Sequence, residues 1–570
     1  MIVAVFLLGL FIGASGVCDF QFAVNYDVND VIKNSDTQNA LIEDIMTWEG
    51  KFMVNGIGLN AKSGLTYDGS WLNYSTGLPI LLHDFSAASK ESVHLGLLAL
   101  GLDETKTHVQ TLFKSSMGGN GNVKDYVLDV LKRKLASYNG WDKQYPGFGG
   151  YLPWYSVTDD GMKLLEHEEW KSAVPSLDNG EMIWGLIAVV QALKDANQPD
   201  LANDYQNYVD KLSLTALDIF LNETSKGIRC VAQISDITKS PKENTYSQDN
   251  TCLLDDPYEG ELFLLFAELY SDWSNYSVSA DDIWKLKQAK SKAVPYSGEN
   301  GEKITVQEGY WFSSHEQWKF MELPYFDSEI ANGIYLNGER ARSHYSKANG
   351  FPGLLAAVTN VSSFDNYNLT KLPAYVSAAG IQEIASQKVE TTSLYTPYGA
   401  FPMLLHPDTR GYGLAWYLNM LKGDRMQGPQ GSTESIWIDG SMISPVQTWD
   451  SKITSVLAMN GGIIDLTRKY LNETDKYEQF KNRIDSEWKK VFGSTVPANG
   501  AYYLPSKGFE TNGVGFDCGI NSTLSTKTSA GTTAGSTVSP GVVETTTQGS
   551  GDKAGISVAF LVVLALFYMI

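Results

Sequence analysis

The segment from about Asp19 to Cys518 has no Pro/Ser-rich linker and no clean break in composition. Long stretches of apolar residues at helical spacing recur through it, and aromatic- and glycine-rich loops separate them. The clearest stretches are residues 123–138, 181–196, 201–221, 261–270, 453–470 and 479–492. Several are apolar around most of their circumference, which is typical of helices packed inside a larger helical assembly.

This pattern predicts a fold dominated by α-helix: a single (α/α) toroid, or helical barrel, over residues 18–518 with long loops and a few short strands. Two smaller helical domains are the alternative. Strand signals are sparse, and residues 309–313 and 501–505 carry the best of them. Long ordered loops on a rigid scaffold are where function tends to lie.

Both ends of the chain differ from this central segment. Residues 1–17 combine an apolar run with small residues before Cys18, which indicates a signal peptide; a buried helix and a lipoprotein signal at Cys18 are the alternatives. Residues 519–550 are a Ser/Thr-rich stalk. Residues 551–570 are typical of a GPI-anchor signal whose attachment site is Gly549, Ser550 or Gly551, with a C-terminal transmembrane helix as the alternative.

Cysteines and sequons agree with an exported, membrane-anchored glycoprotein at the cell surface. Four cysteines allow three connectivities, and we expect a local Cys230–Cys252 bond and a Cys18–Cys518 bond that ties the two ends together. Asn-x-Ser/Thr triplets predict glycosylation on wet surfaces. They begin at Asn73, Asn222, Asn275, Asn360, Asn368, Asn472 and Asn521.

Composition and missing motifs exclude several classes of function. The net charge of −21 argues against nucleic acid as a partner, because phosphate binding needs a surplus of Lys and Arg. The sequence has no nucleophile elbow, phosphate-binding loop or Rossmann fingerprint, and its seven His show no metal-ligand spacing. We therefore expect no cofactor and no metal. Aromatic residues at 12%, together with surplus carboxylates, suggest a surface that handles sugars.

Acidic residues cluster where the predicted helices begin. Asp178 and Glu181 stand three residues apart, as in a variant of a helix capping box. Residues 255–262, D-D-P-Y-E-G-E-L, place four carboxylates before a very apolar helix, including Glu259 and Glu261. Crowded carboxylates raise one another's pKa, and a raised pKa is what a general acid for glycoside cleavage requires.

Further candidates lie in three later segments. Residues 311–324 contain His315, Glu316 and Trp318, of which His315 is either a base or a hydrogen-bonded wall residue. Residues 395–402, with Tyr395 and Tyr398, resemble an aromatic loop that lines a cleft. The last segment offers Asp439, Trp449 and Asp450, and Asp450 is either functional or a plain helix cap.

Four motifs together resemble the glycoamylase-like (α/α)-barrel family, and within it the endo-β-1,2-glucanases. They are D-N-G-E at 178–181, Y-E-G-E-L at 258–262, Y-T-P-Y-G-A-F at 395–401 and T-W-D-S-K at 448–452. The resemblance covers roughly residues 48–491. It implies an inverting endo-glycosidase that hydrolyses a β-linked glucan, β-1,2-glucan foremost. We also expect the protein to be a monomer.

The resemblance also implies residue roles. Glu261 would be the general acid, with Glu259 as rival and Glu316 as a further source of the acid. Asp450 would activate water, with Asp439 as rival. The remaining candidates would contact sugar: Asp178, Glu181, Glu259, His315, Glu316, Trp318, Tyr395, Tyr398, Asp439 and Trp449.

An inverting pair predicts that the Glu261 and Asp450 carboxyls face one cleft about 6.5–9.5 Å apart. A noncatalytic glycan-binding or adhesion ectodomain is the alternative. A polysaccharide lyase or sugar epimerase is a third reading, against which the charge of −21 argues because a uronate substrate would need basic residues.

Overall fold

The computed structural model describes residues 18–165, 168–248, 252–363, 374–497, 500–509 and 514–518. The expected signal peptide (1–17), stalk (519–550) and anchor signal (551–570) lie outside these residues, as do the sequons at Asn368 and Asn521. Within the described ranges, no helix has both the length and the apolar character needed to cross a membrane.

Helices make up most of the regular structure. The α-helices are α1 Val28–Lys33, α2 Ser35–Glu49, α3 Ala88–Gly101, α4 Thr107–Ser116, α5 Val123–Gln144, α6 Ser176–Asp195, α7 Pro199–Phe220, α8 Glu261–Tyr270, α9 Ala280–Lys290, α10 Lys319–Glu322, α11 Glu329–Ala348, α12 Phe401–Leu405, α13 Arg410–Leu421, α14 Trp449–Met459, α15 Ile464–Glu473 and α16 Tyr477–Phe492. Two 3-10 helices, η6 Ser314–Gln317 and η10 Pro397–Ala400, also border the site described below.

The strands are short and scattered. They are β1 Gly69–Leu72, β2 Pro79–His83, β3 Phe85–Ser86, β4 Tyr155–Thr158, β5 Gly161–Leu164, β6 Ala173–Pro175, β7 Leu221–Asn222, β8 Gly227–Ile228, β9 Val231–Ile234, β10 Tyr246–Ser247, β11 Ala293–Ser297, β12 Lys303–Gln307, β13 Val358–Thr359, β14 Tyr375–Val376, β15 Leu394–Tyr395, β16 Gln427–Gly428, β17 Gly431–Ser432, β18 Ile436–Trp437 and β19 Val446–Thr448.

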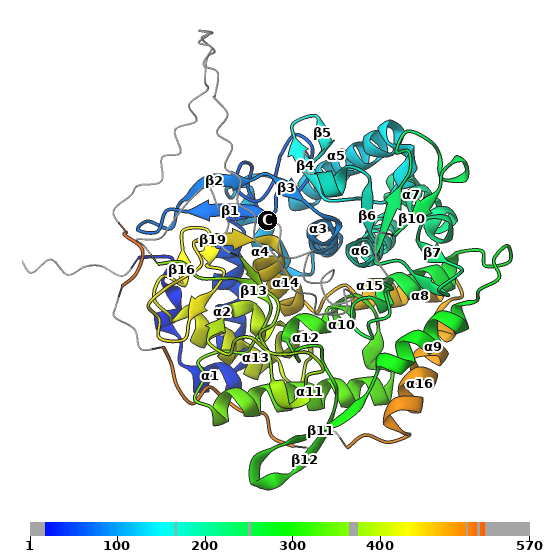
Figure 1. The fold of residues 1–570 in the computed structure, drawn as a ribbon. Coiled ribbons are helices and arrows are strands. Elements are labelled where there is room, and N and C mark those ends of the chain that lie inside the picture. The colour runs from blue at the N-terminus through cyan, green and yellow to red at the C-terminus, as the bar shows by residue number, and fades with distance from the viewer. Residues whose placement is uncertain are drawn as a thin grey trace, which may run out of the picture.

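The helices form two concentric layers, which confirms the expected (α/α) barrel (Figure 1). Helices α12, α14, α3, α6 and α8 pack side by side in that order and are buried around most of their circumference. Further helices cover them from outside: α13 on α12, α2 on α14, α5 on α3, α7 on α6, and α16 on α8. Of these, α2, α5, α7 and α16 keep an exposed face, whereas α13 is itself largely buried. A helix that is apolar all round belongs inside an assembly, which is why the inner layer reads as near-continuous apolar sequence.

A small antiparallel sheet, in the order β19–β1–β2, lies at one rim of the barrel (Figure 1). Its register pairs Gly69 with both His83 and Thr448, so the residues flanking these strands meet at one end of the sheet. A Cβ atom at Gly69 would stand 1.8 Å from the Gln447 carbonyl oxygen, so only glycine allows this approach. The sheet thus fixes Asp68, just before β1, beside the start of α14.

Three local expectations were wrong. The stretch 453–470 is not one helix but α14 and α15, because Gly461 and Gly462 break it with φ of +88° and +64°. Residues 309–313 form a tight turn, in which Phe312 has φ of +56°. Residues 501–505 form no strand either, because Tyr503 bonds to side chains instead: its N–H donates to Ser343 Oγ and its carbonyl accepts from Trp416 Nε1.

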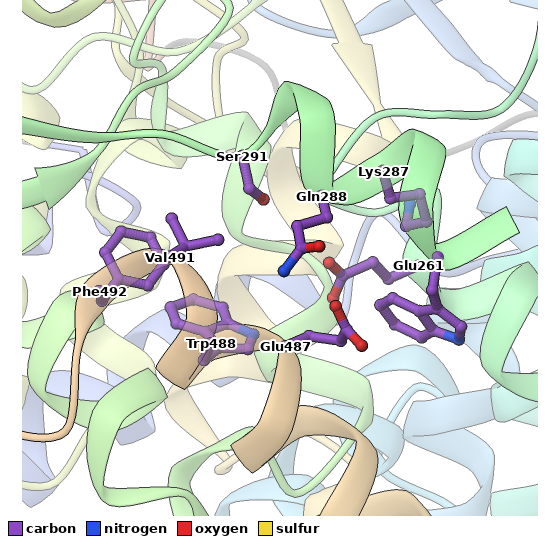
Figure 2. A pocket seen from close by; sticks show the side chains of 9 residues that line it. Glu261, Lys287, Gln288, Ser291, Glu487, Trp488, Val491 and Phe492 are labelled. Atoms are coloured by element: carbon purple, nitrogen blue, oxygen red, sulfur yellow. The ribbon is translucent and has the colours of Figure 1, made fainter. Parts of the chain in front are cut away.

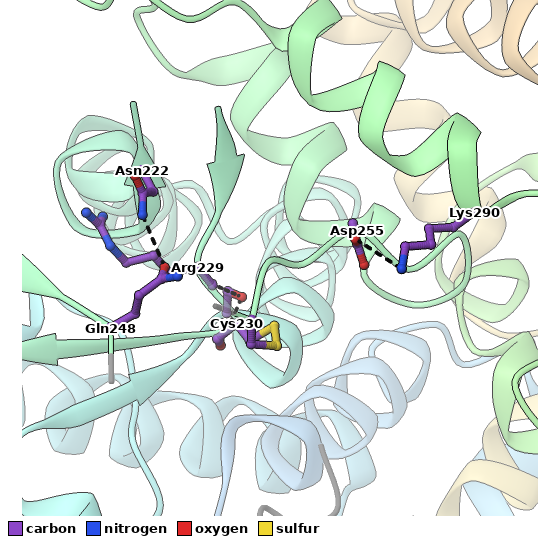
Figure 3. The surroundings of a disulfide bond; sticks show 8 residues. Asn222, Arg229, Cys230, Gln248, Asp255 and Lys290 are labelled. Atoms are coloured by element: carbon purple, nitrogen blue, oxygen red, sulfur yellow. Dashed lines mark hydrogen bonds and ion pairs between the residues drawn. A yellow bond between two sulfur atoms is a disulfide. The ribbon is translucent and has the colours of Figure 1, made fainter. Parts of the chain in front are cut away.

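Both expected disulfides are present, Cys18–Cys518 and Cys230–Cys252. The second bond joins the segment between β8 and β9 to the start of an acidic loop, residues 255–260 (Figure 3). Lys290 of α9 pairs with Asp255 at 3.7 Å on the far side of the same segment. The disulfide and this ion pair therefore hold the entry to the loop from two sides.

Candidate active site

The start of α14 and the rim sheet bring four ionisable groups together. Asp450 lies in the first turn of α14, and its Oδ2 accepts a hydrogen bond of 2.7 Å from Lys90 Nζ of α3. Lys90 Nζ also lies 3.4 Å from Asp68 Oδ1, and His83 Nδ1 lies 2.6 Å from Asp68 Oδ2. Among the described residues, Asp450 Oδ1 has no hydrogen-bond partner. The Asp450 side chain as a whole is 25% exposed, whereas Oδ1 itself is a buried acceptor.

The start of α6 adds two carboxyls, Asp178 and Glu181, and an aromatic stack from other segments lies beside the first of them. Asp178 Oδ2 accepts a 3.0 Å hydrogen bond from Trp154 Nε1. The half-buried Trp154 ring stacks on Trp170 at 5.1 Å and on Phe85 at 5.6 Å between centroids. The stack fixes the Trp154 indole beside Asp178, a carboxylate of the kind that accepts from sugar hydroxyls. One turn deeper, Glu181 is buried.

The acidic loop at residues 255–260 carries Glu259 and is held rigidly. Asp256 Oδ1 accepts hydrogen bonds of 3.0 Å from the N–H groups of Tyr258 and Gly260. Two buried lysines bind its carbonyls: Lys287 Nζ donates to Asp256 O, and Lys319 Nζ donates to Pro257 O at 2.5 Å. These bonds fix the backbone on both sides of Glu259.

Among the described residues, no lysine forms an ion pair with the Glu259 carboxyl. Its Oε1 lies 3.8 Å from His315 Nε2, and in the described structure its Oε2 accepts no hydrogen bond. Burial raises the pKa of Glu259 well above its usual range, and the nearby Asp256 carboxylate raises it further. The group therefore keeps its proton at a pH where an ordinary glutamate has lost it.

A hydrogen-bonded chain sets the state of His315. Trp318 Nε1 can only donate, and it donates to the Tyr398 hydroxyl, which in turn lies 2.9 Å from His315 Nδ1. The Tyr398 proton is therefore free for Nδ1, and His315 then presents Nε2–H toward Glu259. Burial lowers the pKa of His315 to about 4, so the ring is neutral near neutral pH.

The two halves of the site belong to one cluster. Burial raises the pKa of Glu181 well above its usual range, and the charges of Asp178, Glu322, Glu259 and Asp450 raise it further. Burial likewise raises the pKa of Tyr398, to which Asp450 and Glu259 both contribute. The pKa values of Glu181 and Tyr398 are thus each raised by both the Glu259 and the Asp450 carboxyls.

Glu261 lies elsewhere. Its Oε2 accepts hydrogen bonds from Lys319 Nζ at 2.9 Å and from the Tyr325 hydroxyl at 2.5 Å. It also lines a small cavity whose other walls come from α9 and α16, the outer helices of the barrel (Figure 2). The expectation that Glu261 and Asp450 face one cleft therefore loses its geometric support. Glu261 neutralises the lysine that holds the acidic loop.

Glu316 is also a buried structural anchor. Its Oε1 accepts a 2.9 Å hydrogen bond from the N–H of Trp311. Burial raises the pKa of Glu316 to about 7, against the opposing effect of backbone N–H groups and Arg342. It braces the tight turn 309–313 and thereby the half-buried Trp311, rather than facing the cleft itself.

The structure leaves three other candidates outside this acidic cluster. Tyr395 is fully buried in a second apolar cluster, where its hydroxyl donates to Thr392 O. Asp439 is exposed in a turn and accepts from Ser441 N at 2.9 Å. Trp449 is fully buried and donates to Gly58 O at 2.6 Å. In place of contacting sugar, these three residues hold local structure.

The sequence interpretation missed Lys90, Asp68, His83 and Trp154. Lys90 had a usable signal, because a lysine in a helix that is otherwise buried on every side must have a charged partner. The other three come from loops and strand ends whose meeting depends on the sheet register. In the described residues, no group of three or more His, Cys, Asp or Glu has an arrangement that could hold a metal ion.

A helical barrel with a rim of buried carboxyls and stacked aromatics is the architecture of an (α/α)-barrel glycosidase. The family model "Endo-beta-1,2-glucanase SGL", of glycoside hydrolase family 162, matches residues 65–516. The chain therefore belongs to this family of glycosidases, as its motifs suggested.

Solved structures agree with the family. The endo-β-1,2-glucanase from Talaromyces funiculosus in complex with sophorose is 33% identical, with a TM-score of 0.82 over 88% of this chain and 100% of that chain. A glutamate-to-glutamine variant of that enzyme with β-1,2-glucan is also 33% identical, with a TM-score of 0.81 over 88% and 99%. A β-1,2-glucanase from Parabacteroides distasonis, 12% identical with a TM-score of 0.50 over 79% and 60%, shares the fold. No curated protein matches the chain.

Proposed function

We propose that this protein hydrolyses β-1,2-glucan within the chain, by an inverting mechanism in which Glu259 is the general acid and Asp450 the general base. The observation that carries this proposal is that both carboxyls border one cluster, and each keeps one oxygen without a hydrogen-bond partner among the described residues. Family membership supports the substrate, because the similar Talaromyces funiculosus enzyme was solved with sophorose and with β-1,2-glucan.

The two carboxyls are set up for opposite tasks. Burial and the Asp256 carboxylate raise the pKa of Glu259, so it keeps its proton, as a donor to the leaving-group oxygen must. Asp450 accepts a hydrogen bond from Lys90, which favours its ionised form and suits an acceptor of a proton from water. Water then attacks the anomeric carbon as the glycosidic bond breaks, so a β-linkage yields an α-anomer.

The cleft offers distinct groups for the sugar itself. Trp154 and its stacked neighbours provide a flat face, and Asp178 and Glu181 provide acceptors for hydroxyls. Trp318 and Tyr398 lie behind His315, so they orient the wall of the cleft and do not contact sugar.

A glucan panel with product analysis tests this function. The chain, without its two apolar ends, should release reducing ends from β-1,2-glucan and not from β-1,3-, β-1,4- or β-1,6-glucan. Proton NMR during the first minutes should show the α-anomer before mutarotation, and the products should be oligosaccharides rather than glucose. Binding of β-1,2-glucan in a calorimeter without any turnover would instead mark a noncatalytic glycan-binding protein.

We further propose that the protein is exported and held at the cell surface by a GPI anchor. The two disulfides and the exposed sequons at Asn275 and Asn472 support export. Expression of the full chain in a secretory host should give a protein that phosphatidylinositol-specific phospholipase C releases from cells and that peptide N-glycosidase shortens. Retention after phospholipase treatment would favour the transmembrane alternative.

A further inference from the structure

Lys90 is a buried cation in the middle of the acidic cluster. It lies in the first turn of α3, its side chain is 9% exposed, and its Nζ contacts Asp450 Oδ2 at 2.7 Å and Asp68 Oδ1 at 3.4 Å. An ammonium so far from water is stable only with such partners.

The surroundings hold Lys90 in one place. His83 Nδ1 fixes Asp68 from the β2 side at 2.6 Å. The next residue of α3, Glu91, accepts from Lys134 Nζ at 2.6 Å and from Thr66 N at 2.9 Å. The helix turn that carries Lys90 is therefore anchored to α5 and to the segment before β1, and its ammonium has little freedom to leave Asp450.

The charged groups that face Lys90 come from four elements. Burial opposes its charge, but Asp450 of α14, Asp68 beside β1 and Asp178 of α6 together raise the pKa of Lys90 above its usual value. His315 of η6 would repel it if protonated, yet the pKa of His315 is about 4, so that ring is neutral near neutral pH. Lys90 thus stays a cation throughout the range in which the enzyme would work.

We propose that Lys90 is a positioning residue for hydrolysis: its ammonium holds Asp450 by Oδ2, keeps that carboxyl ionised, and leaves Oδ1 directed to the water it must deprotonate. This inference deepens the proposed function and rests on it. Lys90 itself transfers no proton and touches no reacting atom.

The charges around Asp450 predict in which direction each substitution shifts the pH dependence of activity. Burial raises the pKa of Asp450, Lys90 lowers it, and Asp68 raises it. Activity requires ionised Asp450, so it falls as pH drops through this pKa. Removing the charge of Lys90 should move the acid limb of the profile to higher pH, whereas removing the charge of Asp68 should move it to lower pH.

Three variants of the full chain test this: Lys90→Met, Lys90→Arg and Asp68→Asn, with kcat/KM on β-1,2-glucan measured against pH. We expect Lys90→Met to raise the acid-limb midpoint by at least about one pH unit, a tenfold change in proton affinity. Lys90→Arg should stay within about half a unit of wild type, because the cation is kept. Asp68→Asn should lower the midpoint.

Lys211→Met is the control, since it removes a lysine from a pair with Asp142 that joins the outer helices α7 and α5. It should leave the acid limb unchanged. A folded Lys90→Met enzyme with the wild-type acid limb would overturn the inference. If Lys90→Met gives no folded or active protein, the direction in which Asp68→Asn moves the acid-limb midpoint decides. A shift of that midpoint to higher pH refutes the inference. A wild type without turnover would refute the proposed function instead.

Discussion

The two sides of the cleft use lysine in opposite ways. On the base side, Lys90 touches the Asp450 carboxylate directly. On the acid side, Lys287 and Lys319 touch only backbone carbonyls of the acidic loop, and Lys319 is neutralised by Glu261. The same kind of side chain therefore bonds a reacting carboxylate on one side, and on the other it fixes a loop and pairs with Glu261.

This difference separates the proton affinities of the two carboxyls. Burial raises the pKa of both Glu259 and Asp450. The bonded Lys90 ammonium opposes the rise at Asp450, whereas at Glu259 the Asp256 carboxylate adds to the rise and outweighs the opposing effect of Lys319. A pair of titratable groups whose surroundings push their pKa values apart can act as acid and base at one pH. In this protein, the two pKa values differ because Lys90 bonds directly to the Asp450 carboxylate, whereas Lys287 and Lys319 bond to backbone carbonyls near Glu259.

The largest effect should come from the base side. Asp450→Asn should lower kcat/KM on β-1,2-glucan by about 10²–10⁴-fold, because the amide cannot take a proton from water. Asp439→Asn is the matched control, since Asp439 is exposed in a turn, and it should leave the rate unchanged. If Asp439→Asn lost activity and Asp450→Asn kept it, Asp439 and not Asp450 would be the general base.

On the acid side, we expect Lys319 to contribute to stability rather than to the chemical step. Lys319→Met leaves Glu261 buried without its cation, which should cost about 3–5 kcal/mol of unfolding free energy in urea titrations. Lys62→Met breaks the well-exposed pair with Asp159 and should leave Tm unchanged. If Lys319→Met kept wild-type stability, the clamp on the acidic loop would have no energetic importance.

The aromatic stack should affect binding more than chemistry. Trp154→Phe keeps the ring stack but removes the hydrogen bond to Asp178, and KM should rise about tenfold with little change in kcat. Trp273→Phe removes a comparable indole bond, to Ala267 O, at the outer end of α8 and should leave KM unchanged. A fall in kcat alone would show that Trp154 acts on the transition state.

The smallest effect concerns the basic limb of the pH profile. Activity requires protonated Glu259, so it falls as pH rises through the pKa of that group. The charge of Glu316 contributes to the raised pKa of Glu259, after burial and Asp256. Glu316→Gln should therefore move the basic limb to lower pH, by less than about one unit. A shift to higher pH would contradict this arrangement of charges.

The sequence was enough to predict the barrel and both disulfides, and it singled out the segments that contain Glu259 and Asp450. Helices buried on every side read plainly as apolar stretches, and α8 begins and ends where its pattern predicts. The family resemblance covered nearly the range that the family model matches.

Side-chain direction could not be predicted from the same sequence. Glu259 and Glu261 stand two residues apart, but only Glu261 lies within α8, whose first turn directs it to Lys319 and Tyr325. Lys90 and Asp450 are 360 positions apart, and their contact depends on how α3 packs against α14. A local sequence pattern contains no information about the direction of the Glu259 and Glu261 side chains or about the contact between Lys90 and Asp450.

The most direct test compares Glu259→Gln with Glu261→Gln on β-1,2-glucan, with Tm measured for both. If Glu259 is the acid, Glu259→Gln should lower kcat by about 10²–10⁴-fold while Tm and glucan binding stay near wild type. Glu261→Gln should lower Tm and keep most of the activity at a temperature where it is folded. A stable but inactive Glu261→Gln enzyme beside an active Glu259→Gln enzyme would contradict the assignment.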